Sequence, residues 1–300
     1  MNNPSEKRVV VFAYSEVGYI GLSALLKKGT NIVAVYTHQD NPNENIWFQS
    51  VAQLALQNNL PVVYDETLSS AEAYTRLQQL APNIIFSFYY RDMIPEAILN
   101  LANDGAFNLH GSLLPKYRGR APVNWAVLKG ETETGATLHH MLAKPDAGAI
   151  VDQEKVSIEP DETAEQVSEK VNKAAAIILE RQVDNILAGT FTSYPQDNAL
   201  ASYFGRRKPD DGKINWDHSA QQIHNLVRAV TRPYPGAFTF FNQDKIFIWK
   251  TRLHKDSQTQ AVPGTIISLQ PFLVATGEGV IEIIEMTPKT AMSINTRLGE

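Results

Sequence analysis

Short apolar segments separated by helical stretches dominate the N-terminal part of the sequence. Val9–Ala13, Ile32–Tyr36 and Asn83–Phe88 are almost wholly apolar, which is typical of strands buried on both faces of a parallel sheet. Pro61–Tyr64 predicts a shorter strand, and helical spacing lies between these segments, as in Trp47–Gln57. Alternating strands and helices require right-handed crossovers, so the sequence predicts an α/β fold with a Rossmann-like, mostly parallel sheet.

The character of the sequence changes after about Thr190. The stretch Ser193–Asn198 is mostly polar and contains proline, which predicts a linker over residues 193–205, and short strands with little helix follow. We expect strands at Ala237–Phe241, Ile246–Leu253, Gly264–Leu269, Leu273–Ala275 and Val280–Met286. The sequence thus predicts an α/β domain over residues 1–192, a linker over 193–205 and a small β-barrel domain over 206–300.

Composition limits the partners and the compartment. The 300 residues include no cysteine, which excludes disulfides and thiolate metal sites and fits a reducing compartment such as the cytoplasm. The formal net charge of -5 argues against nucleic acid as the main partner, because neutralising phosphates requires a basic face. No apolar run reaches about 18 residues and no N-terminal signal pattern is present, so we expect no membrane insertion.

The segment Gly105–Pro122 contains the candidate catalytic residues. Asn108 and His110 are spaced by two within a strand-like stretch, so both side chains leave the same face of the strand. An amide N–H can stabilise a developing oxyanion, and an imidazole can move a proton near neutral pH. A core histidine satisfied by a neighbouring amide is the alternative, so the interpretation depends on the surrounding residues.

Those surrounding residues resemble a known family. Phe107–Pro115, followed by Tyr117–Gly119, is similar to the signature of the 10-formyltetrahydrofolate-dependent formyltransferases. In that family the Asn and the His are paired with an Asp in a pattern close to Asp-x-Gly-x-Ile, which is Asp146–Ile150 here. The resemblance covers nearly the whole chain and implies a formyltransferase with an OB-type C-terminal barrel.

The chemistry of formyl transfer gives each of the three polar residues a role. The attacking amine must be neutral, and it must lose a proton as a tetrahedral oxyanion forms. We expect His110 to be the general base, and later the general acid toward the folate nitrogen. Asn108 would donate an N–H to the oxyanion, and Asp146, if it approaches His110, would favour the imidazolium and fix the ring.

The resemblance also implies where the folate binds. The co-substrate is 10-formyltetrahydrofolate, and its implied contacts are two loops and one arginine. These are Asp92, Met93, Ile94, Arg120 and the segment Leu142, Ala143, Lys144, Pro145 and Asp146. Because side chains at Asp92 and at Lys144-Pro145 vary within the family, we expect contacts from the backbone rather than from side chains.

The branch of the family that this sequence resembles most formylates UDP-4-amino-4-deoxy-L-arabinose, a step of lipid A modification that gives polymyxin resistance. Thr37–Pro42 and Phe86–Arg91 carry this finer resemblance. A pyrophosphate binds to arginines or helix N-termini, so Arg206, Arg207 and Arg228 are candidates by residue type and by their place near the domain junction.

Two kinds of cofactor can be considered from the sequence, a metal ion and a nicotinamide. His139 and His140 are adjacent, but neighbouring residues on a strand point to opposite faces and no third ligand lies nearby in the sequence. The opening strand is followed by Gly18 and Gly21 without Gly-x-Gly-x-x-Gly, which does not support a nicotinamide cofactor. We therefore expect neither a metal nor a nicotinamide cofactor.

Other functions stay open on the sequence alone. A methionyl-tRNA formyltransferase shares the catalytic residues, although no long basic insertion is present here and the total charge is acidic. A non-catalytic nucleotide-sugar-binding subunit would not need the histidine, and a hydrolase would use water in place of the amine. The sugar branch also carries an NAD-dependent decarboxylase domain after this one, so a longer protein with that domain and a free-standing homologue are both alternatives.

Overall fold

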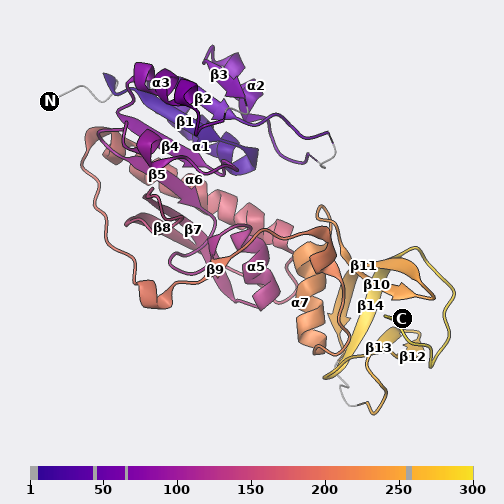
Figure 1. Ribbon diagram of the computed structural model, residues 1–300. Helices are drawn as coiled ribbons and strands as arrows, with labels where there is room; N and C mark the ends of the chain where they lie inside the picture. Colours follow the sequence, from indigo (N-terminus) through magenta and orange to yellow (C-terminus); the bar gives the residue numbers. More distant parts are fainter. Residues whose placement is uncertain (1–5, 43–45, 65–66, 255–258, 300) are drawn as a thin grey trace. The chain divides into compact units, whose positions relative to one another are not determined.

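The computed structural model describes residues 6–42, 46–64, 67–254 and 259–299, which are traced in Figure 1. Contacts divide the chain into two compact units. The first comprises Met1–Gly119, Thr134–Val156 and Glu169–Phe204, and the second comprises Arg120–Glu133, Ser157–Ser168 and Gly205–Glu300. The domain boundaries expected from the sequence, residues 1–192, 193–205 and 206–300, stay a prediction.

A seven-stranded sheet forms the centre of the first unit, in the order β3-β2-β1-β4-β5-β7-β8. The first five strands pair in parallel, and β7 is antiparallel to β5. The strands are β1 (Val9–Ala13), β2 (Ile32–Thr37), β3 (Val62–Tyr64), β4 (Ile84–Phe88), β5 (Ala106–His110), β7 (Glu133–His140) and β8 (Ile150–Ser157). β1 and β4 are buried along their whole length, because neighbouring strands and packed helices cover them.

Helices connect the parallel strands, as the alternating pattern requires. They are α1 (Ser15–Lys27), α2 (Val51–Gln57), α3 (Ala71–Leu80) and α4 (Glu96–Leu99), and the long α6 (Ala164–Ala188) follows the last strand of the sheet. α2 begins later than the predicted Trp47, because the Ser50 side chain accepts a hydrogen bond from the Gln53 N–H and so caps the helix. The predicted fold class, a mostly parallel Rossmann-like sheet with a separate β-rich domain, is confirmed.

The second unit contains an antiparallel sheet in the order β10-β11-β14-β13-β12. Its elements are α5 (Pro122–Lys129), α7 (Ala220–Val230), β10 (Ala237–Phe241), β11 (Asp244–Leu253), β12 (Ile266–Leu269), β13 (Phe272–Ala275) and β14 (Val280–Thr287). Ser219 and Gln222 cap α7 reciprocally, and the helix buries its apolar stripe against β11 and α5. The OB type of this domain stays a prediction.

The segment predicted as a linker is hydrogen-bonded along the first unit. The backbone of Tyr194 exchanges two hydrogen bonds with Ile150, and β9 (Tyr203–Phe204) pairs in parallel with β6 (Arg118–Gly119). Between these contacts lies a short 3₁₀ helix, Asn198–Leu200. The segment therefore holds the loop that contains Arg118 in place.

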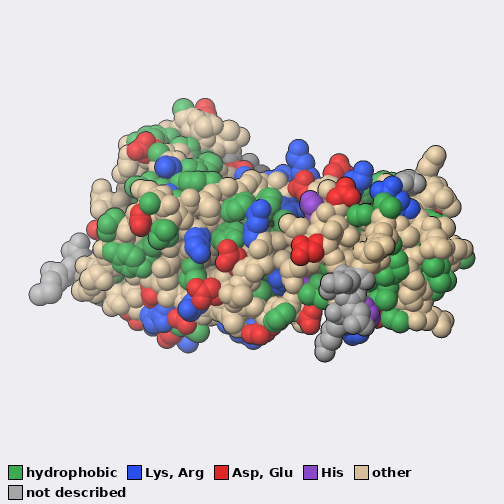
Figure 2. All heavy atoms as spheres, turned by 90° about the horizontal axis from the view of Figure 1, so that it is seen from below, with side chains coloured by type: hydrophobic (Ala, Val, Ile, Leu, Met, Phe, Trp, Pro, Cys, Tyr) green, Lys and Arg blue, Asp and Glu red, His purple; other side chains and the backbone are tan. Residues whose placement is uncertain are grey.

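The surface shows a mixture of charges. On the face drawn in Figure 2, lysine and arginine side chains are interspersed with aspartate and glutamate among the residues shown in colour. None of the helices in the described parts of the chain is long and apolar enough to cross a membrane.

Candidate active site

Asn108 and His110 lie at the carboxyl end of β5, between β4 and β7 in the sheet. Phe107 and Leu109 alternate with them and are buried, as the period of two in a strand requires. Asn108 is half-buried, and only 6% of His110 is exposed. The pair therefore occupies the end of a parallel strand, where α/β sheets place their ligands.

Asp146 reaches this pair from the connection between β7 and β8. Its Oδ1 lies 3.6 Å from His110 Nδ1 and 3.5 Å from Asn108 Nδ2. Its Oδ2 accepts a hydrogen bond from the Gly119 N–H at 2.8 Å. A glycine is required there, because its φ of +95° is left-handed and an added Cβ would collide with the Phe204 carbonyl. The structure thus brings the three sequence-predicted side chains together, with a backbone donor that the sequence did not indicate.

The second nitrogen of His110 fixes its tautomer. His110 Nε2 lies 2.8 Å from the Tyr117 carbonyl oxygen, which can only accept, so Nε2 carries a proton and donates it. Nδ1 is then the nitrogen that can take up a second proton. Because Nδ1 faces the Asp146 carboxylate, a positive charge formed on the ring would be stabilised there.

The Asp146 carboxyl group is strongly acidic in this environment. Burial raises the pKa of Asp146, but its polar neighbours, with the charge of His110 the largest contribution and the Gly119 N–H a further one, outweigh that effect and hold the pKa well below its ordinary value. Asp146 is consequently a carboxylate throughout the neutral range, and it is available to stabilise a charged imidazole.

A further histidine belongs to the site. His139 on β7 is the direct cross-strand neighbour of Asn108, and its Nε2 lies 3.1 Å from Asn108 Nδ2 and 3.5 Å from Asp146 Oδ1. His140 points to the opposite face, where it contacts Phe107 and Phe191, and burial followed by the charge of His139 lowers its pKa. Sequence reasoning placed the two histidines on opposite faces but missed the role of His139, because that depends on the pairing register of β5 with β7.

Arg118 supports the loop that carries Gly119. Its side chain is fully buried, and it donates hydrogen bonds to Gln196, Asn198 and Tyr203 at 2.6–3.1 Å. Gln196 in turn donates to the carbonyls of Asp146 and Gly148 at 2.8 and 2.7 Å. A buried guanidinium therefore ties the predicted linker to the Asp146 loop.

This arrangement makes Arg118 a stability determinant. We expect Arg118→Met to lower the free energy of unfolding by about 3 kcal/mol, because it leaves the buried amide oxygen of Gln196 without its donor. The exposed neighbouring Arg120→Met should change it by less than about 0.5 kcal/mol. Urea unfolding at pH 7 measures both, and equal effects of the two variants would show that Arg118 does not have this role.

The predicted folate-binding residues lie in two loops that are anchored on one hydrophobic cluster. Ile94, 4% exposed, is part of this cluster, and Met141 packs against it. Met93 and Leu142 next to them are 59% and 54% exposed, and each loop thus presents an apolar side chain to solvent. Asp92, Ala143, Lys144, Pro145 and Arg120 are also exposed.

The predicted substrate arginines differ in their surroundings. Arg206 is exposed, whereas Arg207 lies over the Trp125 ring at 4.9 Å and donates to the Asp211 carbonyl. Arg228 is buried and donates to Asn225 and to the carbonyls of Glu162 and Val127. The nitrogen atoms of Arg228 already have partners within the second unit.

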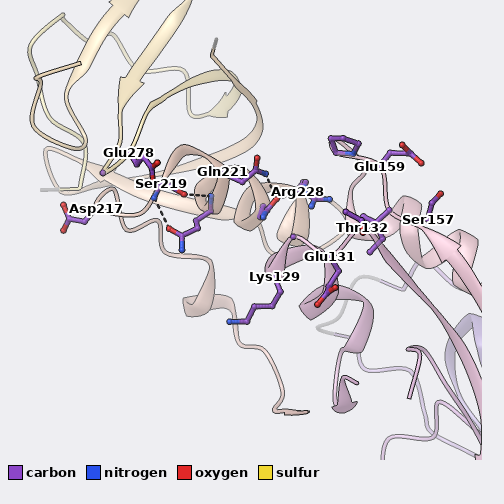
Figure 3. Close-up of a pocket in the computed structure, with 16 residues that line it drawn as sticks. Lys129, Glu131, Thr132, Ser157, Glu159, Asp217, Ser219, Gln221, Arg228 and Glu278 are labelled. Atoms are coloured by element: carbon purple, nitrogen blue, oxygen red, sulfur yellow. Dashed lines mark hydrogen bonds between the residues drawn. The ribbon is translucent and has the colours of Figure 1, made fainter. Parts of the chain in front are cut away.

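A cavity of about 930 Å³ in the second unit includes Arg228 in its lining (Figure 3). The charged side chains of this lining are Lys129 and Arg228 against Glu131, Glu159, Asp217 and Glu278. Four carboxylates against two cations do not favour a pyrophosphate. The assignment of Arg206, Arg207 and Arg228 to the nucleotide-sugar site stays a prediction.

A smaller cleft of about 340 Å³ lies in the first unit, beside the carboxyl ends of β1 and β2. Its lining includes Tyr14, His38, Asp40 and Phe48, and so includes part of the segment that resembles the sugar branch. The Tyr14 hydroxyl donates to Asp40 at 2.9 Å. Aromatic faces with a carboxylate at a strand end make this cleft a candidate binding region.

Metal ligation finds no support in the described residues. No group of three or more histidines and carboxylates there is arranged to hold a metal ion. The Nε2 atom of His139 contacts the Asn108 amide, and its Nδ1 atom contacts the His140 carbonyl oxygen.

An amide, an imidazole, a carboxylate and a backbone N–H at the end of a parallel strand are typical of an enzyme that transfers a group through a carbonyl centre. The chain belongs to the formyl transferase family: the family model described as "Formyl transferase" matches residues 7–183, and that of the "Formyl transferase, C-terminal domain" matches residues 206–298. The enzyme class expected from the sequence, a formyltransferase, is thereby confirmed.

Solved structures share the fold. WlaRD, a sugar 3N-formyl transferase determined in the presence of dTDP and 5-N-formyl-THF, has a TM-score of 0.71 and 23% identity over 95% of this chain and 99% of its own. An N-formyltransferase from Helicobacter canadensis, in complex with folinic acid and dTDP-3-aminofucose, has a TM-score of 0.71 and 22% identity over 92% and 99%. A 4-N formyltransferase from Francisella tularensis has a TM-score of 0.65 and 19% identity over 81% and 97%. At these identities the likeness establishes the fold alone.

Proposed function

We propose that this protein transfers the formyl group of 10-formyltetrahydrofolate to the amino group of a nucleotide-linked amino sugar. The observation that carries the proposal is the meeting of Asn108, His110 and Asp146 at one point, with the spacing 3.5–3.6 Å between their polar atoms. A non-catalytic binding subunit would have no use for a histidine whose only free lone pair faces a carboxylate.

The donor fits the two loops beside this cluster. A pterin is flat, with apolar faces and amide-like edges, and it suits exposed apolar side chains on loops with accessible backbone groups. Met93 and Leu142 offer such side chains on loops held by the same core cluster. Because the Ile94 side chain is buried in that cluster, its contribution to folate binding would come from its backbone, as expected from the sequence.

The side chains of the cluster would act in sequence. His110 Nδ1 takes the proton that the amine loses as it attacks the formyl carbon. Asp146 stabilises the resulting imidazolium, and the Asn108 amide donates to the oxyanion. The imidazolium then returns the proton to the folate nitrogen as that group leaves.

For the acceptor we propose UDP-4-amino-4-deoxy-L-arabinose, which would place the reaction in lipid A modification and polymyxin resistance. The supporting observations are the resemblance of Thr37–Pro42 and Phe86–Arg91 to that branch and the sugar acceptors named for two structural relatives, WlaRD and the Helicobacter canadensis enzyme. The net charge of -5 does not favour a tRNA as the acceptor, because neutralising phosphates requires a basic face. A cytoplasmic location and a decarboxylase domain as a partner in a longer protein stay predictions of the resemblance.

A substrate comparison tests the proposal. The protein is incubated with 10-formyltetrahydrofolate and, in separate reactions, UDP-4-amino-4-deoxy-L-arabinose, dTDP-3-aminofucose, methionyl initiator tRNA or no acceptor, and tetrahydrofolate release is followed. We expect release with the UDP sugar at a kcat/KM at least tenfold above that with the dTDP sugar.

Each other outcome has a definite meaning. Preference for the dTDP sugar would contradict the UDP assignment, but the protein would still be a sugar N-formyltransferase. Turnover with the tRNA alone would contradict the sugar proposal, and turnover without any acceptor would make the protein a hydrolase.

A further inference from the structure

His139 is a buried polar side chain that touches the catalytic cluster. Only 1% of it is exposed, and it faces Asn108 across the β5–β7 pair. Its Nδ1 lies 2.8 Å from the carbonyl oxygen of His140, which can only accept a hydrogen bond. Nδ1 therefore carries a proton, and a ring with only that proton presents the lone pair of Nε2 to Asn108 Nδ2, 3.1 Å away, with Asp146 Oδ1 at 3.5 Å from the same nitrogen.

This lone pair selects the orientation of the Asn108 side-chain amide. A side-chain amide can turn by about 180° around its last torsion, which exchanges its N–H donors for an acceptor oxygen. Here the group that meets Asn108 Nδ2 is the Nε2 acceptor on one side and the Asp146 carboxylate on the other. The reversed amide would bring its oxygen against two acceptors, so the neighbours select one orientation.

The two contacts are unequal. Asp146 Oδ1 is 3.5 Å from Asn108 Nδ2, at the limit of a hydrogen bond, whereas His139 Nε2 is at 3.1 Å. The N–H toward His139 is therefore held, and the second N–H, whose contact with Asp146 is long, is the one left to donate to a developing oxyanion. His139 itself is not the proton acceptor, since its one lone pair is occupied by Asn108.

We infer that His139 is a positioning residue, which holds the Asn108 amide with its donor side toward the reacting carbonyl. The inference rests on the proposed function, in which Asn108 stabilises the oxyanion. It adds a residue to the site that acts only through Asn108, and it assigns His139 an acceptor role that requires a neutral ring with its proton on Nδ1.

Two substitutions of similar length separate this role from packing. His139→Gln places a carbonyl oxygen near the position of Nε2, whereas His139→Met fills the same space without an acceptor of comparable strength. We expect His139→Met to lower kcat about tenfold, with KM for both substrates changed less than about twofold. His139→Gln should retain kcat within about threefold of the wild type. Equal kcat values for the two variants would overturn the inference.

Asn108→Ala provides the second arm of the experiment. That variant should lower kcat about a hundredfold, and adding His139→Met to it should cause no further loss if His139 acts through Asn108. A full additional tenfold loss in the double variant would show an independent effect and overturn the assignment. Thermal unfolding of each variant identifies any loss of folded protein.

A readout without turnover separates this inference from the proposed function. The side-chain amide protons of Asn108 can be identified in ¹H–¹⁵N spectra by their loss in Asn108→Ala. They should exchange with water faster in His139→Met than in the wild type or in His139→Gln; unchanged exchange in His139→Met would contradict the inference. Absence of formyl transfer by the wild type would defeat the proposed function, while this comparison would still decide the role of His139.

Discussion

Replacing His110 by glutamine is expected to lower kcat for formyl transfer about a thousandfold. Glutamine can still donate an N–H to the Tyr117 carbonyl, in place of His110 Nε2, so the local hydrogen bond is kept. What it lacks is a basic nitrogen beside Asp146, so the amine would have no acceptor for the proton it sheds. Single-turnover measurements with saturating folate and amino sugar isolate this chemical step.

His140→Gln is the matched control for this prediction. His140 belongs to the same part of the sheet but packs on the other face, against Phe107 and Phe191. Its replacement should leave kcat within about twofold of the wild-type value, because His140 does not face the catalytic cluster. The variant therefore reports only the structural effect of losing a histidine in this part of the sheet. A fall of less than tenfold for His110→Gln, or equal falls for the two variants, would remove His110 from the proposed role.

The strands could be predicted because burial imposes a simple pattern on them. Val9–Ala13 coincides with β1. This strand lies between two others and under packed helices, so all of its side chains are buried and apolar. Ala237–Phe241 coincides with β10, because an aromatic-rich run that ends at the turn after Phe241 is typical of a strand. Local chemistry sufficed in both cases.

Elements that depend on distant partners were not predictable. α5 follows Ala121, whose φ of +52° starts the helix in a conformation that no local signal at this position indicates. Arg118 is fully buried by partners 78–85 positions further on, although arginines are normally exposed. His139 joined the site through strand register, which is fixed only when the whole sheet is assembled.

The candidate site was predictable in part for the same reason. Asn108 and His110 share a strand, so their common face follows from spacing alone. The approach of Asp146 came from the family resemblance, because a loop with a left-handed residue, φ +53° at Asp146, has no periodicity that predicts its path. Residue type could not separate the buried, fully bonded Arg228 from the exposed Arg206.

Asp146→Asn is expected to lower kcat about 500-fold, since a neutral amide cannot stabilise an imidazolium at His110. Asparagine can keep the hydrogen bond from the Gly119 N–H through its Oδ1, so the loop should remain in place. The control is Asp184→Asn, which removes an exposed carboxylate paired with Lys28 and should leave kcat unchanged. A fall below tenfold for Asp146→Asn would show that the charge of Asp146 is not needed for the reaction.

The acid dependence of stability tests the same carboxylate without turnover. Because the folded protein holds the pKa of Asp146 well below the ordinary value of about 3.9, the unfolded chain takes up this proton first as the pH falls. The stabilisation is therefore complete above about pH 5 and is lost as the pH falls below about 3.9 toward the folded-state pKa. In urea unfolding, the difference between wild type and Asp146→Asn should shrink as the pH falls from about 5 to about 3. A difference that did not change with pH would mean that packing, and not the charge of Asp146 beside His110, accounts for the effect of Asp146.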